Sequence, residues 1–293
     1  MNTMREIKTL GIAAPASGFE RLRFDKGVAL LQDFGLRVKL DARVFNKTGY
    51  LAGSDEDRAA LLTELFADDG IDAVMCARGG YGSMRLLPLL DLDTLARSPK
   101  PLIGFSDCTA LFCALYAQGA RNCWHGPVVT QLGDLSGESL GVFKAALRGE
   151  ALAYETGHGR CLRAGHVAAP LFGGNLAVLT HMAGTPYFPD LSGHILFLEE
   201  QNEPLYKIDR MFTQLKLMGV LDSLNGIVLG EFLNCGEVKA VHTRLLELLD
   251  GRDIPVLADF PAGHACNNVI LPLGTVAVLD SAAQTLVFID GEV

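Results

Sequence analysis

A serine at a predicted strand-to-helix turn is a candidate for a catalytic role in this sequence. An apolar run at 101–104 ends in a glycine, and Ser106 follows two positions later. The apolar stretch 110–115 then predicts a buried helix. A helix N-terminus offers free N–H groups and a positive dipole end, which would stabilise an alkoxide or a tetrahedral oxyanion. Ser106 is therefore a candidate nucleophile, with helix capping by Ser106 or Asp107 as the alternative.

Carboxylates at a predicted strand end and a histidine in a glycine-flanked loop could complete such a site. Glu199 and Glu200 follow the predicted strand 194–198, and His264 directly follows a glycine. A serine hydroxyl is a poor nucleophile at neutral pH, so it needs a nearby base whose tautomer is fixed by a third group. Ser106, Glu199 and His264 would supply these roles. The spacing alone does not exclude the alternative that His264 has only a structural role and that the two glutamates are simply exposed to solvent.

A glycine-rich loop, ARGGYG at 77–82, follows the predicted strand 73–76. Glycines permit positive φ, so the backbone N–H groups of this loop can converge on an anion. Neither G-x-G-x-x-G nor a lysine-ended P-loop is present, which argues against a phosphate site. An ordinary tight turn is the alternative interpretation.

Helices and strands alternate through the first half of the chain. The expected elements of this half are strand 7–14, helix 24–34, strand 36–40, helix 56–66 and strand 73–76. Such alternation is typical of a parallel, doubly wound sheet. Ligands of these sheets bind beyond the carboxyl ends of the strands, where the glycine-rich loop and the Ser106 turn both lie.

The second half mixes further helices and strands and closes on a hairpin. Its expected elements are strand 194–198, helix 206–218, strand 226–229, helix 238–249, strand 256–258 and hairpin 275–289. Periodicity is lost between these halves, from about residue 149 to residue 170. We therefore predict an α/β protein. It has an N-terminal doubly wound parallel sheet in residues 1–150, a linker at 151–170 and a smaller mixed α/β C-terminal domain at 171–293.

Composition narrows the class of protein further. The 293 residues are 49% hydrophobic and 20% charged, and the net charge is −9 without any basic run. This argues against nucleic acid and anionic membranes as partners, and no apolar run is long enough to span a bilayer. The first residues lack the apolar core of a signal peptide.

The seven scattered cysteines include no C-x-x-C pair, so we expect reduced thiols in a cytoplasmic protein and no metal site.

Short motifs occur in a fixed order along nearly the whole chain. They are GIAAPAS at 11–17, YLAG at 50–53, ARGGYG at 77–82, IGFSD at 103–107, WHGP at 124–127, GGNL at 173–176, FLEE at 197–200, YKIDR at 206–210 and GH at 263–264. Together they resemble the LD-carboxypeptidases. This serine peptidase family includes the muramoyltetrapeptide carboxypeptidases and the microcin C self-immunity peptidases.

The resemblance implies a catalytic triad. Ser106 would be the nucleophile, His264 the general base and then acid, and Glu199 the carboxylate that orients the histidine. The family commonly has aspartate where this chain has Glu200, which leaves open which glutamate faces the histidine. The triad would span the cleft between the two domains, so relative domain motion could gate activity.

The resemblance also implies an oxyanion hole and a carboxylate contact. The backbone N–H of Asp107, with one from Gly79 or Gly80, would stabilise the developing negative charge. Arg78 is a candidate for binding the free carboxylate of the substrate, with bracing of the loop as its alternative role.

The implied reaction is hydrolysis, through an acyl-enzyme, of the L,D bond that releases the terminal D-alanine from a murein tetrapeptide. No metal or cofactor takes part, and the family resemblance suggests a homodimer. One alternative is a microcin C-type peptidase that cuts an aminoacyl-nucleotide conjugate, although segment 203–210 is more similar to the murein type. The others are a non-catalytic ligand-binding module and thiol catalysis through Cys266, which lies near His264 in the sequence.

Overall fold

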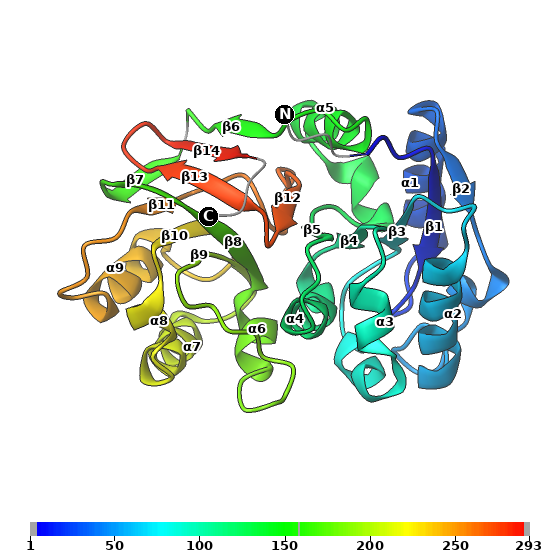
Figure 1. The fold of residues 1–293 in the computed structure, drawn as a ribbon, viewed down its shortest axis with the longest axis horizontal. Helices are drawn as coiled ribbons and strands as arrows, with labels where there is room; N and C mark the ends of the chain where they lie inside the picture. Colours follow the sequence, from blue (N-terminus) through cyan, green and yellow to red (C-terminus); the bar gives the residue numbers. More distant parts are fainter. Residues whose placement is uncertain (1–4, 158, 290–293) are drawn as a thin grey trace.

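A computed structural model describes residues 5–157 and 159–289 of the chain, in which two β-sheets lie side by side with helices packed around them (Figure 1). The first sheet has the order β12-β5-β4-β3-β1-β2, and only the β12–β5 pair is antiparallel. The predicted doubly wound parallel sheet is confirmed. Its strands are β1 (Thr9–Ala13), β2 (Arg37–Lys39), β3 (Ala73–Cys76), β4 (Leu102–Gly104), β5 (Cys123–His125) and β12 (Leu271–Leu273).

The helices of the first half connect these strands. Ser54 caps the second of them, because its hydroxyl accepts the Asp57 N–H at 3.0 Å. Gly27 lets the first helix pack closely against the backbone at Val129, since a Cβ at position 27 would lie 1.9 Å from the Val129 carbonyl oxygen. The α-helices are α1 (Arg21–Asp33), α2 (Asp55–Ala67), α3 (Leu92–Ala96), α4 (Thr109–Ala117) and α5 (Gly137–Leu147). The 3-10 helices are η1 (Ala42–Phe45), η2 (Ser83–Leu89), η3 (Ser106–Cys108) and η4 (Val129–Asp134).

The second sheet contains both parallel and antiparallel strand pairs, with the order β6-β14-β13-β8-β9-β10-β11-β7. Its central strands β8, β9, β10 and β11 run parallel, and the outer pairs are antiparallel. The strands are β6 (Ala153–Glu155), β7 (Arg160–Arg163), β8 (His166–Asn175), β9 (Ile195–Gln201), β10 (Gly226–Leu233), β11 (Val256–Ala258), β13 (Val276–Asp280) and β14 (Thr285–Phe288). The helices are α6 (Leu176–His181), α7 (Leu205–Leu217), α8 (Val220–Ser223) and α9 (Val238–Leu248).

The segment 151–170 differs from the expected linker. It contributes β6, β7 and the first part of β8 to the second sheet, where β6 pairs with β14 and β7 pairs with β11. Both β6 and β7 are edge strands with partly exposed side chains, so their sequences carry little hydrophobic alternation. Their partners lie far away along the chain, and local patterns could not reveal the pairing.

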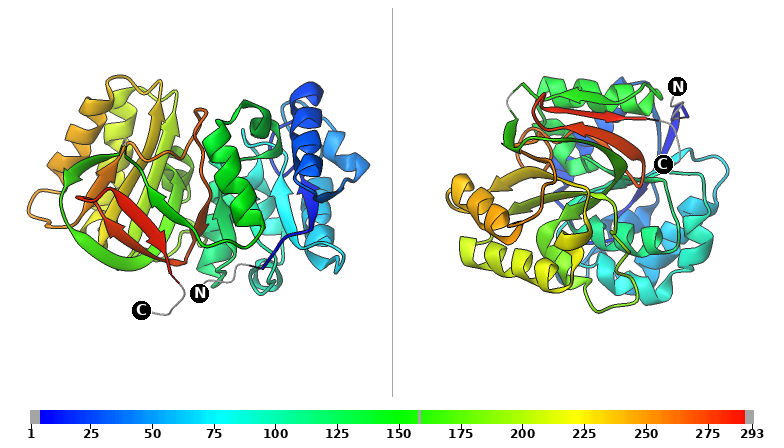
Figure 2. Two further views of the ribbon diagram at one scale, coloured as in Figure 1. Left: turned by 90° about the horizontal axis from the view of Figure 1, so that it is seen from above. Right: turned by 60° about the vertical axis from the view of Figure 1, so that its left-hand side comes forward.

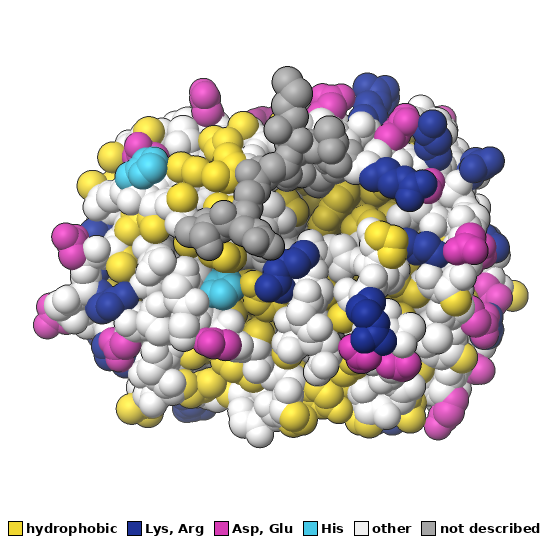
Figure 3. Space-filling model, viewed as in Figure 1, with side chains coloured by type: hydrophobic (Ala, Val, Ile, Leu, Met, Phe, Trp, Pro, Cys, Tyr) yellow, Lys and Arg dark blue, Asp and Glu magenta, His cyan; other side chains and the backbone are white. Residues whose placement is uncertain are grey.

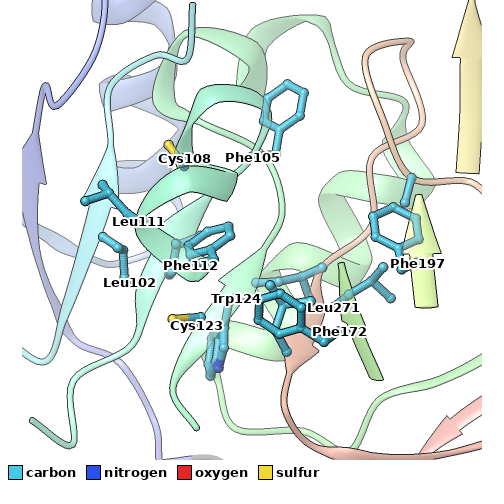
Figure 4. Packing of buried hydrophobic residues seen from close by; sticks show 14 of the residues in the cluster. Leu102, Phe105, Cys108, Leu111, Phe112, Cys123, Trp124, Phe172, Phe197 and Leu271 are labelled. Carbon is cyan, nitrogen blue, oxygen red and sulfur yellow. The ribbon is translucent and has the colours of Figure 1, made fainter. Parts of the chain in front are cut away.

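The two sheets share buried side chains where they meet. Figure 4 shows Phe172 and Leu271 close to Trp124 in this region, and Phe197 on the strand to their right belongs to the same buried cluster. The contact is reinforced by β12, which comes from the C-terminal part of the chain but pairs with β5 of the first sheet, with Leu271 opposite His125. Seen from above, the halves form one continuous molecule (Figure 2).

The surface carries charges of both signs. On the face shown in Figure 3, acidic and basic side chains are interspersed among hydrophobic and neutral ones. Within the part of the chain that the structure describes, no helix is both long and apolar enough to cross a membrane.

Candidate active site

Ser106 lies at the sharp turn between β4 and α4. Its φ is +61°, in the left-handed region that non-glycine residues rarely adopt and that often marks functional sites. Cys108 is the N-cap residue of α4 and makes no side-chain capping bond, while the Asp107 carboxylate accepts the Ser83 N–H at 2.7 Å. Helix capping therefore does not describe this turn. Among the described residues, no hydrogen-bond partner engages the Ser106 hydroxyl.

His264 and Glu199 are joined by a short hydrogen bond. Nδ1 of His264 lies 2.6 Å from Oε2 of Glu199, and the glutamate is completely buried on β9. The ring of Phe105 lies against the imidazole, with centroids 4.7 Å apart. A carboxylate at Nδ1 fixes the tautomer that carries a proton there, so Nε2 is left to accept a proton.

Glu200 points to the other face of β9 and has a different role. Its carboxylate accepts hydrogen bonds from Asn175 Nδ2 at 3.0 Å and from the backbone N–H groups of Ala177 and Gln201, each at 2.8 Å. The Ala177 N–H lies in the first turn of α6, which favours a negative charge. Because successive side chains of a strand face opposite sides, only Glu199 is directed at His264.

The loop that carries His264 is braced by two buried amide side chains. Asn268 accepts the Gly263 N–H at 3.1 Å and donates to Gln131 Oε1 at 2.9 Å, and Gln131 Nε2 lies 3.3 Å from the Gly263 carbonyl. Gln131 belongs to η4, so the first half of the chain helps to hold the histidine loop of the second half. No motif singled out these two residues in the sequence.

Glu231 supports the same loop from β10. Its carboxylate accepts the Ala265 N–H at 2.8 Å, and burial raises its pKa, with the charge of Glu199 acting in the same direction. Glu231 was not among the residues predicted from the sequence. Its position just beyond the predicted strand 226–229, at the same sheet edge as Glu199, could have indicated a place near the site.

A cavity of about 320 Å³ brings Ser106 and His264 to one surface. Gln201 and the two cations Arg78 and Arg23 also line it. The structure describes both Ser106 and His264, and no hydrogen bond joins them. Catalytic hydrogen bonds are often loose before substrate binds, so shared access to one cavity is the relevant geometry.

The glycine-rich loop lies directly against the serine. A Cβ at Gly79 would be 3.0 Å from the Ser106 Cβ and 3.2 Å from its hydroxyl oxygen. Gly80 has a φ of +105°, and a Cβ there would be 2.5 Å from Ser17 Oγ. Within the described part of the chain, the backbone N–H groups of Gly79, Gly80 and Asp107 donate to no acceptor. Glycine is therefore required for this close approach, which leaves unpaired donors near the hydroxyl.

Arg78 is an exposed side chain that both lines the cavity and donates a hydrogen bond to the Gly18 carbonyl. The two roles considered for Arg78, which are binding of a substrate carboxylate and bracing of the loop, are therefore compatible. Arg23, at the start of α1, is a second cation of this cavity and pairs with Asp134. Cys266 is exposed and is not part of the cavity wall.

The charge state of His264 follows from opposing influences on its pKa. Burial lowers the pKa, but the charge of Glu199 and the hydrogen bond to it act in the opposite direction. The charges of Glu200 and Glu231 add to this effect, and the net result is a pKa above the ordinary 6.5. A general base with a pKa near the working pH combines a useful neutral population with a strong tendency to take a proton.

Comparison with known proteins identifies the family. Residues 10–126 match the LD-carboxypeptidase N-terminal domain and residues 168–279 match the LD-carboxypeptidase C-terminal domain. A probable murein peptide carboxypeptidase of Bacillus subtilis is 35% identical over 291 residues, covering 95% of this chain and 91% of the relative. The chain belongs to the LD-carboxypeptidase family. It is a serine-type carboxypeptidase and therefore a hydrolase.

Two further LD-carboxypeptidase relatives bear on the fold and on the range of substrates. The crystal structure of a muramoyltetrapeptide carboxypeptidase from Oxalobacter formigenes matches with a TM-score of 0.85 and 31% identity, covering 98% of this chain and 100% of that one. The microcin C7 self-immunity protein of Escherichia coli is 32% identical over 304 residues, covering 92% of this chain and 88% of the relative. The family thus includes proteins with two different named roles.

Proposed function

We propose that this enzyme hydrolyses the L,D peptide bond that releases the terminal D-alanine from murein tetrapeptides. The observation that carries the proposal is that His264, which is hydrogen-bonded to Glu199, lines the same cavity as Ser106. Membership of the LD-carboxypeptidase family supports the reaction class, and the names of the Bacillus and Oxalobacter relatives support the substrate.

The proposed first step is acylation of the serine. Ser106 Oγ attacks the carbonyl carbon of the scissile bond while Nε2 of His264 takes the hydroxyl proton. Glu199 stabilises the imidazolium that forms, and the histidine then gives this proton to the departing amine of D-alanine. A water molecule, activated by the same histidine, next attacks the acyl-enzyme carbonyl and restores the free serine.

The proposed oxyanion hole consists of backbone donors. The N–H of Asp107, together with one from Gly79 or Gly80, would stabilise the negative oxygen of the tetrahedral intermediate. These N–H groups are unpaired within the described residues, and Gly79 lies against the nucleophile. Preorganised donors of this kind stabilise a transition state strongly because they need no rearrangement during the reaction.

Arg78 is the proposed contact for the free carboxylate of the terminal D-alanine. Its guanidinium lies at the same cavity as Ser106 and keeps its position through the Gly18 carbonyl. A carboxypeptidase must recognise a chain end, and an ion pair with the C-terminal carboxylate would distinguish such an end from an internal residue.

Incubation of the purified enzyme with a murein tetrapeptide tests the proposal. Mass analysis should find a tripeptide product and one free D-alanine for each molecule cleaved. An aminoacyl-nucleotide conjugate serves as the parallel substrate, because the microcin C7 self-immunity protein is a relative. Turnover of the conjugate without turnover of the tetrapeptide would reject the murein assignment.

The rate should fall on the acid side of neutrality. Protonated His264 cannot accept the serine proton, and its raised pKa means that protonation begins above pH 6.5 as the pH is lowered. We expect kcat/KM for D-alanine release to rise with pH through a midpoint above 6.5. Initial rates between about pH 5 and pH 9 measure this. A midpoint below 6.5 would contradict the assignment of His264 as the base.

We further propose that the enzyme acts in the cytoplasm, as a homodimer. Seven free cysteines, five of them buried, are typical of a reducing compartment. The dimer is suggested by the family resemblance, and light scattering during size-exclusion chromatography measures it. A monomeric mass at working concentrations would reject this part of the proposal.

A further inference from the structure

Arg58 is a buried cation whose side chain reaches from α2 to the glycine-rich loop beside Ser106. Only 3% of the residue is exposed. Its Nη1 donates to the carbonyl oxygens of Pro15 and Gly82, the second at 3.0 Å, and its Nη2 pairs with the Asp55 carboxylate. Burying a charge is costly unless it is paired and hydrogen-bonded, and the proposed mechanism does not use this guanidinium. Its burial beside the loop therefore calls for an explanation.

The glycine-rich loop at 77–82 is fastened at both of its ends. At the start, the Ala77 N–H donates to the Ala13 carbonyl at 2.7 Å and so continues the pairing of β3 with β1. At the end, Arg58 holds the Gly82 carbonyl, and a Cβ at Gly82 would lie only 2.9 Å from Nη1 of Arg58. The two glycines of the proposed oxyanion hole lie between these anchors, so the directions of their N–H groups depend on both.

The chain segment that follows β1 is part of the same arrangement. The Ser17 N–H donates to the Gly79 carbonyl at 3.3 Å, and the Ser17 hydroxyl accepts the Tyr81 N–H at 3.1 Å. Arg58 holds this segment two residues earlier, through the Pro15 carbonyl. One guanidinium nitrogen thus joins the last residue of the loop to the segment that contacts the middle of the loop.

The charge of Arg58 also acts on Asp107, whose backbone N–H is the other proposed oxyanion donor. The Asp107 carboxylate is buried and accepts the Ser83 N–H at 2.7 Å. Burial raises the pKa of Asp107, whereas this backbone hydrogen bond and the charge of Arg58 act in the opposite direction. An unbalanced carboxylate beside an oxyanion hole would oppose the developing negative charge, and a neighbouring cation offsets that effect.

We propose that Arg58 is a positioning residue of the oxyanion hole, which holds the glycine-rich loop so that its free N–H groups stay directed at the reacting carbonyl beside Ser106. A guanidinium is planar and carries five donors in a fixed arrangement, so it can hold two carbonyls and a carboxylate at once. Hydrogen bonds from a charged donor are stronger than neutral ones. The loop is therefore ordered before the substrate binds, which is the condition under which such donors stabilise a transition state best.

The kinetic test rests on the proposed function and uses two substitutions. Arg58→Met keeps an unbranched apolar side chain but removes the charge and the donors. We expect it to lower kcat for tetrapeptide cleavage about tenfold to hundredfold with little change in KM, because displaced oxyanion donors weaken binding of the transition state alone. Arg58→Lys keeps the charge without the planar fork and should give an intermediate kcat. Wild-type kcat in either variant would overturn the proposal, so the lysine variant decides the matter if the methionine variant does not fold.

Arg85→Met is the matched control. Arg85 pairs with the same Asp55 carboxylate, with Nη2 2.6 Å from Oδ2, but its side chain is 45% exposed. Within the described part of the chain, this side chain donates to neither the Pro15 nor the Gly82 carbonyl. Its substitution should therefore leave kcat unchanged. An equal loss of kcat in Arg58→Met and Arg85→Met would assign the effect to the shared Asp55 partner and would overturn the proposal.

A peptide boronic acid gives a readout that a merely structural role would not produce. Its boron forms a bond with Ser106 Oγ and places a boronate oxygen in the oxyanion hole. We expect Arg58→Met to weaken this inhibitor by about the same factor as kcat, while calorimetry finds unchanged binding of the intact tetrapeptide when Arg58→Met is added to Ser106→Ala. Equal weakening of the inhibitor and of the tetrapeptide would indicate general distortion of the cavity and would overturn the positioning role.

Failure of the proposed function would appear separately, as the absence of tetrapeptide cleavage by the wild type. The inhibitor comparison between the wild type, Arg58→Lys and Arg85→Met still tests the positioning role in that case, because the adduct requires only the serine and the oxyanion donors. Unchanged inhibitor affinity in Arg58→Lys would then overturn it.

Discussion

Replacement of Ser106 by alanine is expected to reduce D-alanine release by about 10⁴-fold or more, because the acyl-enzyme can no longer form. The fold should be retained, since the Ser106 hydroxyl has no hydrogen-bond partner among the described residues. The change in unfolding free energy should stay within about 0.5 kcal/mol. Release of D-alanine by mass spectrometry and urea unfolding measure the two effects.

Cys266→Ala is the control for the serine variant. Cys266 is exposed and is not part of the cavity wall, so its loss should leave the rate unchanged. Loss of activity in this variant together with a fully active Ser106→Ala would indicate thiol catalysis. An active Ser106→Ala with no sensitivity at Cys266 would mean that another nucleophile acts. A wild-type protein that binds the tetrapeptide without cleaving it would favour the binding-module alternative.

We expect substitution of Glu199 to affect mainly the rate of the reaction and substitution of the adjacent Glu200 to affect mainly the stability of the fold. Glu199→Gln removes the charge that stabilises the imidazolium and the acceptor that fixes the His264 tautomer. Loss of the orienting carboxylate in comparable triads lowers kcat about 10⁴-fold, and we expect a similar reduction here. Measurement of kcat at saturating tetrapeptide tests this.

Glu200→Gln is the matched partner in this comparison. Its carboxylate accepts three hydrogen bonds with two oxygens, and an amide would turn one of these acceptors into a donor. We expect a loss of about 1–3 kcal/mol in unfolding free energy, with a much smaller effect on kcat than in Glu199→Gln. The reverse order of the two kcat values would show that Glu200 orients the histidine.

Much of the fold could be predicted from local patterns, while the pairing of distant short strands could not. The buried strand Ala73–Cys76 and the helix Asp55–Ala67 have clear periodicity and clear boundaries, and both were predicted within one residue at each end. By contrast, β12 is a three-residue strand that contains a proline and joins the opposite sheet. Its place depends on burial against β5, which no local pattern records.

The residues of the candidate active site also fall into those that could be predicted from the sequence and those that could not. Ser106, Glu199 and His264 lie in motifs, so the sequence could nominate them as a group. The choice between the glutamates required the true end of β9, because the predicted strand stopped at 198 and the real one continues to 201. With both glutamates inside the strand, alternation assigns them to opposite faces. The supporting residues Gln131 and Asn268 act through three-dimensional contacts, which sequence spacing does not encode.

The position of β12 has a consequence for how the chain can be divided and synthesised. A polypeptide that stops before residue 271 would leave one edge of β5 without a neighbour, and such open edges promote association between chains. Separate expression of residues 1–150 should therefore yield an aggregation-prone fragment instead of an autonomous unit. During translation, this edge of β5 lacks its partner strand until residues 271–273 have been made, so the incomplete chain exposes an open sheet edge for most of its synthesis.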